Sequence, residues 1–233
     1  QENLGFVRAV NQAAELATGK TILLLNNDAL LEKQTLSNAL ACIEADRGIG
    51  AVGAKIKLLD GRLQEAGSII FSDGACLGYG RGQPADNPEF MFQRDVDYCS
   101  GAFLLFRRET FTDLGGFDED FAPAYYEESD FCIRLREQGL RIVYNPAVQI
   151  THYEFASSGG LSGALSLQAA HREILCSKHE NFLSKQFSND PANYLRARTS
   201  NTHPNVLVID DRVPHPSLGV GYPRCSTFLH ELS

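Results

Sequence analysis

The sequence contains no run approaching the roughly 20 apolar residues that a membrane-spanning helix needs, and no signal peptide opens it. Its six cysteines show no C-x-x-C spacing, which favours reduced thiols over a zinc site or a disulfide framework. A net charge of −8 argues against electrostatic binding to nucleic acid. What remains is a chain of 233 residues that we expect to be cytoplasmic, with room for one sizeable domain and a fragment.

A short apolar segment near the start of the chain ends in a polar cluster. Residues 21–25 are apolar and bounded by polar residues, which predicts a buried strand. Asn26, Asn27 and Asp28 follow directly. Ligands bind at the carboxyl ends of central strands in α/β proteins, and oxygen ligands of this kind suit Mg²⁺ or Mn²⁺. An Asx-rich turn explains the same residues without any function.

A second polar cluster lies at the start of a predicted helix. Glu127, Glu128 and Asp130 lead into residues 131–138, which predict a helix that ends at Gly139. Crowding and burial both raise the pKa of a carboxyl group, which suits it to act as a general base. The helix dipole alone also favours acidic residues in a first turn, by about 0.3–1 kcal/mol each.

The segment from residue 144 to His152 predicts a short strand pair bent at Pro146. The imidazole of His152 is able to complete a metal site of mixed oxygen and nitrogen ligands. A lone histidine after a strand is also a common structural residue.

Five segments together resemble glycosyltransferase family 2, and most of all its rhamnosyltransferase-like branch. In order they are Asn3-Leu4-Gly5-Phe6 with Asn11, LLLNND at 23–28, GGFDE at 115–119, YYEESDFCIRLREQG at 125–139, and Asn145-Pro146 with His152. The resemblance covers residues 1–185. It implies a GT-A fold, a nucleotide-sugar donor, a divalent cation (Mg or Mn) and an inverting transfer.

The resemblance implies roles for particular residues. Asp28 matches the last carboxylate of the family's metal-binding Asp-x-Asp motif, whose first position is Asn26 here. Glu128 matches the second acid of the family's Glu-Asp pair and is the predicted general base, with Glu127 as the alternative. His152 stands where related enzymes place a histidine near the metal and the diphosphate.

Donor contacts are implied as well. The segment from Asn3 to Asn11 corresponds to a loop and helix start beside the nucleotide, and Gly101 and Ala102 fall at the floor of the pocket. The predicted donor-binding residues are Asn3, Gly5, Asn11, Asn26, Asn27, Gly101 and Ala102.

Three parts are expected along the chain. Residues 1–187 predict a family 2-like domain with a Rossmann-like mixed sheet flanked by helices. Its first β-α-β unit is expected to be missing, because the first predicted element, residues 6–17, is a helix without a preceding strand. Residues 188–205 have the composition of a linker. Residues 206–233 resemble the opening strand, loop and helix of a family 4-like glycosyltransferase of the GT-B type.

Between these landmarks the pattern predicts further elements. Residues 34–45 and 161–187 are expected to be helical, and residues 51–59 and 98–106 to be strands. Asp60-Gly61 indicates a hairpin turn. Residues 74–88, rich in glycine, predict a long loop near the acceptor.

The sequence therefore predicts a metal-dependent inverting glycosyltransferase. It would transfer a sugar, rhamnose by resemblance, from a nucleotide-diphosphate donor to a saccharide or lipid-linked acceptor in bacterial surface polysaccharide synthesis. The isolated chain is expected to bind its donor poorly and to be inactive, and peripheral contact with the inner face of the cell membrane is compatible with its basic helix. Two alternatives stay open: a non-catalytic sugar-nucleotide-binding module, which Asn26 favours, and a sugar nucleotidyltransferase.

Overall fold

The computed structural model describes residues 3–153, 161–200 and 221–232, together with residues 215, 217 and 219. The chain divides into two compact units, Gln1–Asn201 and Thr202–Ser233. In the second unit the structure describes one helix, α8 (Tyr222–Leu232). The predicted strand at residues 206–209 lies outside the described residues.

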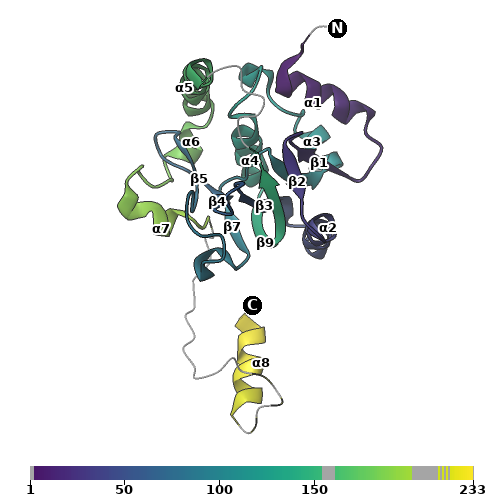
Figure 1. Cartoon of the computed structure of the whole chain (residues 1–233), viewed down its shortest axis with the longest axis vertical. Coiled ribbons are helices and arrows are strands. Elements are labelled where there is room, and N and C mark those ends of the chain that lie inside the picture. The colour runs from purple at the N-terminus through teal and green to yellow at the C-terminus, as the bar shows by residue number, and fades with distance from the viewer. Residues whose placement is uncertain are drawn as a thin grey trace. The chain divides into compact units, whose positions relative to one another are not determined.

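The first unit alternates helices and strands (Figure 1). Its helices are α1 (Gly5–Leu16), α2 (Thr35–Ala45), α3 (Arg108–Asp113), α4 (Glu127–Glu137), α5 (Leu161–Lys178), α6 (Glu180–Leu183) and α7 (Tyr194–Ala197). Its strands are β1 (Thr21–Leu25), β2 (Ala29–Leu31), β3 (Ile49–Lys57), β4 (Leu63–Ala66), β5 (Ser68–Ile70), β6 (Cys76–Gly78), β7 (Arg94–Val96), β8 (Phe103–Arg107) and β9 (Arg141–His152). Single 3₁₀ turns lie at Pro88–Phe90, Glu119–Phe121 and Pro191–Asn193.

Seven of the described strands form one mixed sheet, with the order β1-β8-β3-β9-β2. In addition β4 pairs with β3, and β7 pairs with β9. The β3–β9 pair is parallel, and all the other pairs in this sheet are antiparallel. Strands β5 and β6 form a separate two-stranded sheet. The expected α/β fold with a mixed sheet is thus confirmed.

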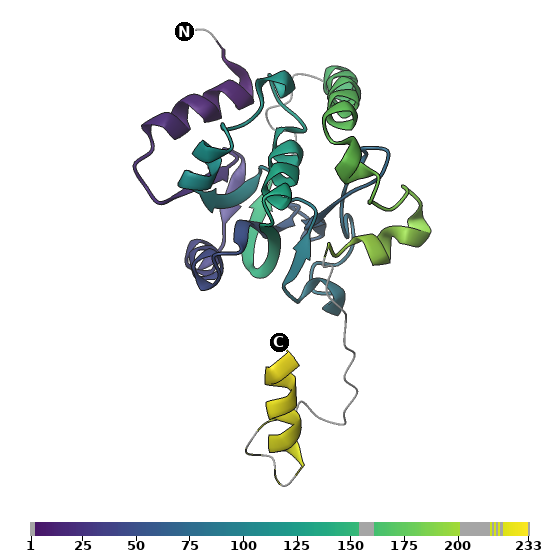
Figure 2. The same cartoon turned by 180° about the vertical axis from the view of Figure 1, so that it is seen from behind.

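Alternating side chains of the central strands build a core on each face of the sheet. On β8, Leu104 and Phe106 belong to one buried cluster, whereas Phe103 and Leu105 belong to the other. This period of two is what a pleated strand imposes. Helix α4 packs on the first face and α2 on the second, so the sheet lies between two helical layers (Figures 1 and 2).

Three local predictions differ from the structure. Helix α4 begins at Glu127 and not at residue 131, so both glutamates are part of the helix. The bend expected at Pro146 is a register irregularity within one continuous strand, β9, because β3 pairs with β9 on both sides of the irregularity. The loop predicted over residues 74–88 contains β6, because Cys76–Gly78 finds a pairing partner in β5.

The described part of the segment with the composition of a linker contains regular structure. Residues 191–197 form a 3₁₀ turn and α7, and Ala197 is buried. Tyr194 packs its ring against Phe71, with ring centroids 5.4 Å apart. These contacts dock the described part of the segment on the first unit, and the boundary between the units falls after Asn201. None of the helices in the described part of the chain has the length and apolar character to cross a membrane.

Candidate functional site

The register of the sheet brings three separate segments together. Leu25 at the end of β1 lies opposite Phe103 of β8, and the Asn26 N–H donates to the carbonyl of Ala102 over 3.2 Å. At the other side, Ala29 of β2 lies opposite His152 of β9. The polar cluster after β1 is therefore held between the start of β8 and the end of β9.

A cavity of 840 Å³ opens at this edge of the sheet. Of the residues predicted from the sequence, its lining contains Asn26, Asn27, Asp28, Gly101, Ala102, Glu127, Glu128 and His152. The other lining residues are Phe6, Leu25, Gln64, Arg81, Tyr98, Ser100, Ala124, Tyr125 and Gln168. The predicted cation ligands and the predicted base thus share one cavity.

Asp28 and His152 form a close pair in this cavity. His152 Nε2 lies 2.9 Å from Asp28 Oδ1, and the two side chains are 7% and 11% exposed, respectively. His152 Nδ1 donates to Gln64 Oε1 over 2.8 Å, which directs the other ring nitrogen towards Asp28. Asn26 Nδ2 lies 3.2 Å from the same Nε2 atom. A histidine that ligates a metal usually donates its other ring N–H to a neighbouring oxygen, as His152 Nδ1 does here.

The chemistry of this pair fits a divalent cation. A carboxylate oxygen and an imidazole nitrogen are ligands that Mn²⁺ accepts, and a carboxylate suits Mg²⁺. Among the residues that the structure describes, no group of three or more His, Cys, Asp or Glu side chains is placed to hold a metal. A cation held by Asp28 and His152 would therefore need oxygen ligands from a substrate or from water.

Glu127 and Glu128 open α4 and line the same cavity. The side chain of Glu127 is buried, and one carboxyl oxygen of each glutamate (Oε2) is buried without a hydrogen-bond partner. Burial raises the pKa of Glu128, while the N–H groups of Gly101 and Ser129 favour its charged form. Burial first, and the charge of Glu128 second, raise the pKa of Glu127 well above its usual value.

The backbone before α4 adopts a conformation that non-glycine residues rarely take. Tyr125 and Tyr126 have φ angles of 77° and 72°. Such a conformation is strained and is concentrated at functional sites. These two residues turn the chain so that α4 starts at the cavity with both glutamates in its first turn.

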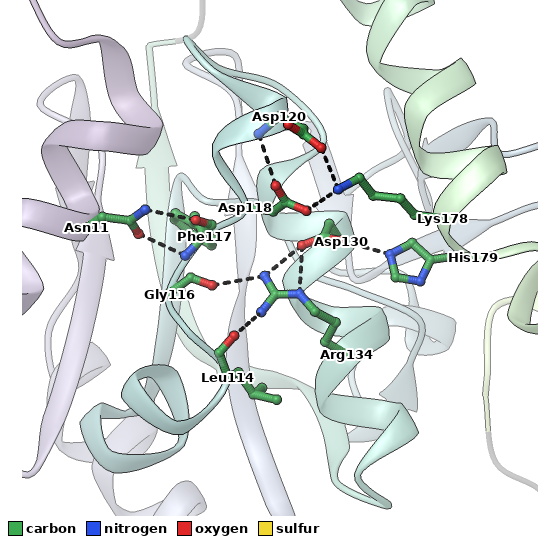
Figure 3. Close-up of polar contacts among 10 residues, drawn as sticks. All are labelled: Asn11, Leu114, Gly116, Phe117, Asp118, Asp120, Asp130, Arg134, Lys178 and His179. Carbon is green, nitrogen blue, oxygen red and sulfur yellow. Dashed lines mark hydrogen bonds and ion pairs between the residues drawn. The ribbon is translucent and has the colours of Figure 1, made fainter.

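A buried ion-pair network anchors α4 (Figure 3). Asp130 is 1% exposed, and its carboxylate accepts from Arg134 Nε over 2.8 Å and lies 2.8 Å from His179 Nε2. Arg134 also donates to the carbonyls of Leu114 and Gly116. The network ties the helix that carries the glutamates to two loops packed around it.

Three predicted donor-binding residues lie outside the lining of this cavity. The Asn3 side chain accepts a hydrogen bond from the Gly5 N–H over 3.0 Å. Gly5 itself packs closely on Pro123. Asn11 exchanges two hydrogen bonds of 2.8 Å with the backbone of Phe117 (Figure 3). These contacts give all three residues structural partners, and a contact with the donor stays a prediction for them.

The sequence patterns did not point to Gln64, Glu65 or Arg81. Gln64 and Glu65 are buried polar residues in the short strand β4. Glu65 accepts hydrogen bonds from the Ser100 N–H and the Ser68 hydroxyl, and burial raises its pKa to about 7. Two consecutive polar residues after a predicted hairpin turn were the available signal, because a strand so close to the core rarely holds them without a purpose.

Solved structures show which fold this is. A crystal structure of GalNAc-T7 with UDP, GalNAc and Mn²⁺ aligns with a TM-score of 0.61 at 14% sequence identity, over 79% of this chain and 37% of that one. The mixed sheet between helices is the GT-A fold of glycosyltransferases.

Sequence comparison gives the family. The family described as "Glycosyltransferase like family 2" matches residues 1–172, and the chain belongs to this family. The O-antigen biosynthesis protein RfbC of Myxococcus xanthus is 31% identical over 153 residues, which are 63% of this chain and 12% of that protein. The N-acetylglucosaminyl-diphospho-decaprenol L-rhamnosyltransferase of Mycobacterium tuberculosis is 36% identical over 93 residues, 39% of this chain and 30% of that protein. The chain thus spans less than a third of either relative.

Proposed function

We propose that this chain is the catalytic domain of a metal-dependent inverting glycosyltransferase. It transfers a sugar from a nucleoside-diphosphate donor to a saccharide or lipid-linked acceptor in the synthesis of a bacterial surface polysaccharide. The names of the relatives, an O-antigen biosynthesis protein and a rhamnosyltransferase that acts on a diphospho-decaprenol, support this class of substrate.

One observation carries the proposal. The Asp28–His152 pair and the Glu127–Glu128 pair come from distant parts of the sequence and line one cavity. Its volume of 840 Å³ is within the range of small-molecule sites, which is about 300–1,000 Å³. A glycosyltransferase has to bind a charged diphosphate and also activate a hydroxyl. The two pairs provide one group for each of these tasks.

The reaction is a single displacement. The Glu128 carboxylate accepts the proton of an acceptor hydroxyl as that oxygen forms a bond to the anomeric carbon of the donor sugar. The bond between this carbon and the diphosphate oxygen breaks, and its electron pair leaves with the nucleoside diphosphate. The products are the glycosylated acceptor with inverted configuration, the nucleoside diphosphate and a protonated Glu128. Base assistance of this kind is worth about 10²–10⁴-fold in rate.

The Asp28–His152 pair would hold the divalent cation. When bound, a cation at this position neutralises the negative charge that develops on the departing diphosphate. Gln64 keeps the His152 ring oriented, and Asn26 adds a polar group beside the same nitrogen. Ser100, Gly101 and Ala102 line the same cavity as this pair and Glu128.

The test is a donor screen on the protein in its full length. Thymidine, uridine and guanosine diphosphate sugars are incubated with manganese or with EDTA, and released nucleoside diphosphate is measured. An N-acetylglucosaminyl-diphospho-alkyl compound serves as the acceptor probe. We expect release from one donor class, loss of release with EDTA, and a drop of about 10²–10³-fold for Asp28→Asn, the loss typical of one charge-stabilising group. Asp113→Asn, at an exposed position of α3, is the matched control.

The products distinguish the alternatives. Release of pyrophosphate in place of nucleoside diphosphate would identify a nucleotidyltransferase. Saturable donor binding without any release would identify a binding module. Unchanged release with EDTA and in Asp28→Asn would contradict the role given to the cation and to Asp28.

A further inference from the structure

The two glutamates of the Glu127–Glu128 pair are adjacent in sequence but have different surroundings. Both lie in the first turn of α4, and both line the cavity. Each has one oxygen that is buried and lacks a hydrogen-bond partner. An unpartnered buried oxygen costs about 1–3 kcal/mol in free energy unless a ligand or water completes it. The pair is therefore built to be completed by a molecule in the cavity.

Few basic side chains of the described residues lie beside this pair. The two arginines of α4 form ion pairs elsewhere, Arg134 with Asp130 and Arg136 with Asp97. Arg81 is the one Lys or Arg among the described residues that line the cavity.

Other titratable groups lie near the pair or line the same cavity. Glu65 on β4, Cys76 on β6 and Tyr98 before β8 are electrostatic neighbours of Glu128, and Tyr125, Asp28 and His152 share the lining of the cavity. Burial raises the pKa of the Cys76 thiol to about 12 and that of Tyr98 well above its usual value, so neither supplies a charge at neutral pH. Two neighbouring buried carboxyl groups without a cation retain a proton between them.

The two glutamates differ in exposure. Glu127 is 5% exposed, whereas Glu128 is only partly buried. Burial first, and the charge of Glu128 second, raise the pKa of Glu127 well above its usual value. In a crowded pair the more deeply buried carboxyl group keeps the proton, which assigns the proton to Glu127. A neutral carboxylic acid is a hydrogen-bond donor, whereas a carboxylate is an acceptor only.

We propose that Glu127 works as a neutral carboxylic acid whose O–H donates a hydrogen bond to a second hydroxyl oxygen of the acceptor, while Glu128 alone removes the proton of the attacking hydroxyl. This inference rests on the proposed function. It makes Glu127 a positioning residue that holds the acceptor, and it selects acceptors with a hydroxyl beside the nucleophile. A carboxylate at position 127 would repel the negative charge on Glu128 and on the diphosphate.

The first arm of the test does not depend on turnover. Infrared difference spectra at neutral pH compare the full-length protein with Glu127→Gln, Glu128→Gln and the control Glu137→Gln, an exposed glutamate of the same helix. Removal of Glu127 should delete a C=O stretch of a neutral carboxylic acid. Removal of Glu137 should delete a carboxylate band. A carboxylate band lost with Glu127→Gln would overturn the proposal, whether or not any donor is found.

The second arm uses the donor and acceptor probe of the screen. Glutamine keeps a donor group and the size of glutamic acid, so Glu127→Gln should retain kcat within about threefold. Glu127→Ala should raise the acceptor KM by about two- to tenfold, the effect of one lost hydrogen bond, with a smaller change in kcat. Glu128→Gln should lower kcat by about 10²–10⁴-fold. If Glu127→Gln loses as much kcat as Glu128→Gln, Glu127 is not a neutral donor and the proposal is wrong.

Discussion

The two pairs of side chains that line the cavity are built in different ways. We call the Asp28–His152 pair the sheet side and the Glu127–Glu128 pair the helix side. The Asp28–His152 pair is assembled by the sheet: the register of β2 against β9 sets the distance, and Gln64 of β4 fixes the ring. The Glu127–Glu128 pair is assembled by a helix start after two residues with positive φ angles. On the first side both histidine nitrogens have protein partners, whereas on the second side one oxygen of each glutamate has none.

This difference indicates how the two sides work. A side whose polar atoms already bond to one another is preorganised, and a bound cation meets ligands that are held in place. A side with unsatisfied buried oxygens depends on the substrate to complete it. Substitutions on the sheet side should therefore lower the affinity for the cation. Substitutions on the helix side should instead impair proton transfer or acceptor binding.

The largest effect on stability is expected where the helix side is anchored. Asp130→Ala removes the carboxylate that meets Arg134 and His179 (Figure 3). Breaking a buried ion pair from one side costs about 3–5 kcal/mol, because the remaining charge is left buried. We expect a loss of this size in the free energy of unfolding, measured by urea denaturation.

An exposed aspartate serves as the control for Asp130→Ala. Asp113→Ala, at an exposed site, should change the free energy of unfolding by less than about 0.5 kcal/mol. If Asp130→Ala is no more destabilising than this control, the network does not anchor α4, and the helix side would have to be held by its apolar packing alone.

The second prediction concerns the free energy of unfolding as a function of pH. The pKa of Glu65 in the folded protein is about 7, above its ordinary 4.5, because the group is buried. Between these values the folded protein holds a proton that the unfolded chain has released, so the contribution of Glu65 to stability falls as pH rises from about 4.5 to about 7. Relative to Glu65→Gln, the wild type should lose on the order of 3 kcal/mol across this window, at about 1.4 kcal/mol per pKa unit.

Urea denaturation at several pH values measures this difference, with the exposed Glu44→Gln as control. An equal stability difference between wild type and Glu65→Gln at pH 5 and pH 8 would show that Glu65 is not a buried carboxyl with a raised pKa. The result bears on the comparison of the two pairs, since Glu65 follows Gln64 in β4 and, in addition to burial, the charge of Glu128 raises its pKa.

The smallest effect is expected for a substitution beside the Asp28–His152 pair, and it is an effect on metal affinity. Gln64→Leu removes the acceptor of His152 Nδ1 without touching a proposed cation ligand. Loss of such an orienting partner typically costs about 10–100-fold in metal affinity. Manganese binding in the presence of the best nucleoside diphosphate, followed by electron paramagnetic resonance, should show this loss. It should be absent in Gln138→Leu, an exposed glutamine at the end of α4. Equal affinity in both variants would mean that Gln64 does not orient the ligand.

Much of the fold follows from local patterns. The apolar segment at residues 21–25 is β1, and the turn at Asp60-Gly61 joins β3 to β4 as expected. These elements have short-range signals, a buried apolar run and a tight turn. The extent of β9 has no such signal, because it depends on neighbours that are far away in the sequence.

The residues of the candidate site also differ in how visible they are in the sequence. Asp28, Glu128 and His152 each stand at the end of an element, where a sequence pattern is visible, and the structure brings them to one cavity. Gln64 and Glu65 act through contacts with residues 88 and 35 positions away, His152 and Ser100. Nothing in the local pattern of β4 reveals such partners. The roles of the residues stay predictions until they are tested.

The most direct measurement of the central claim is nucleoside diphosphate release by Glu128→Gln with saturating donor and manganese, beside donor binding by the same variant. If Glu128 is the base across the cavity from Asp28, binding is retained and release falls by about 10²–10⁴-fold. Release at the wild-type rate would contradict the claim.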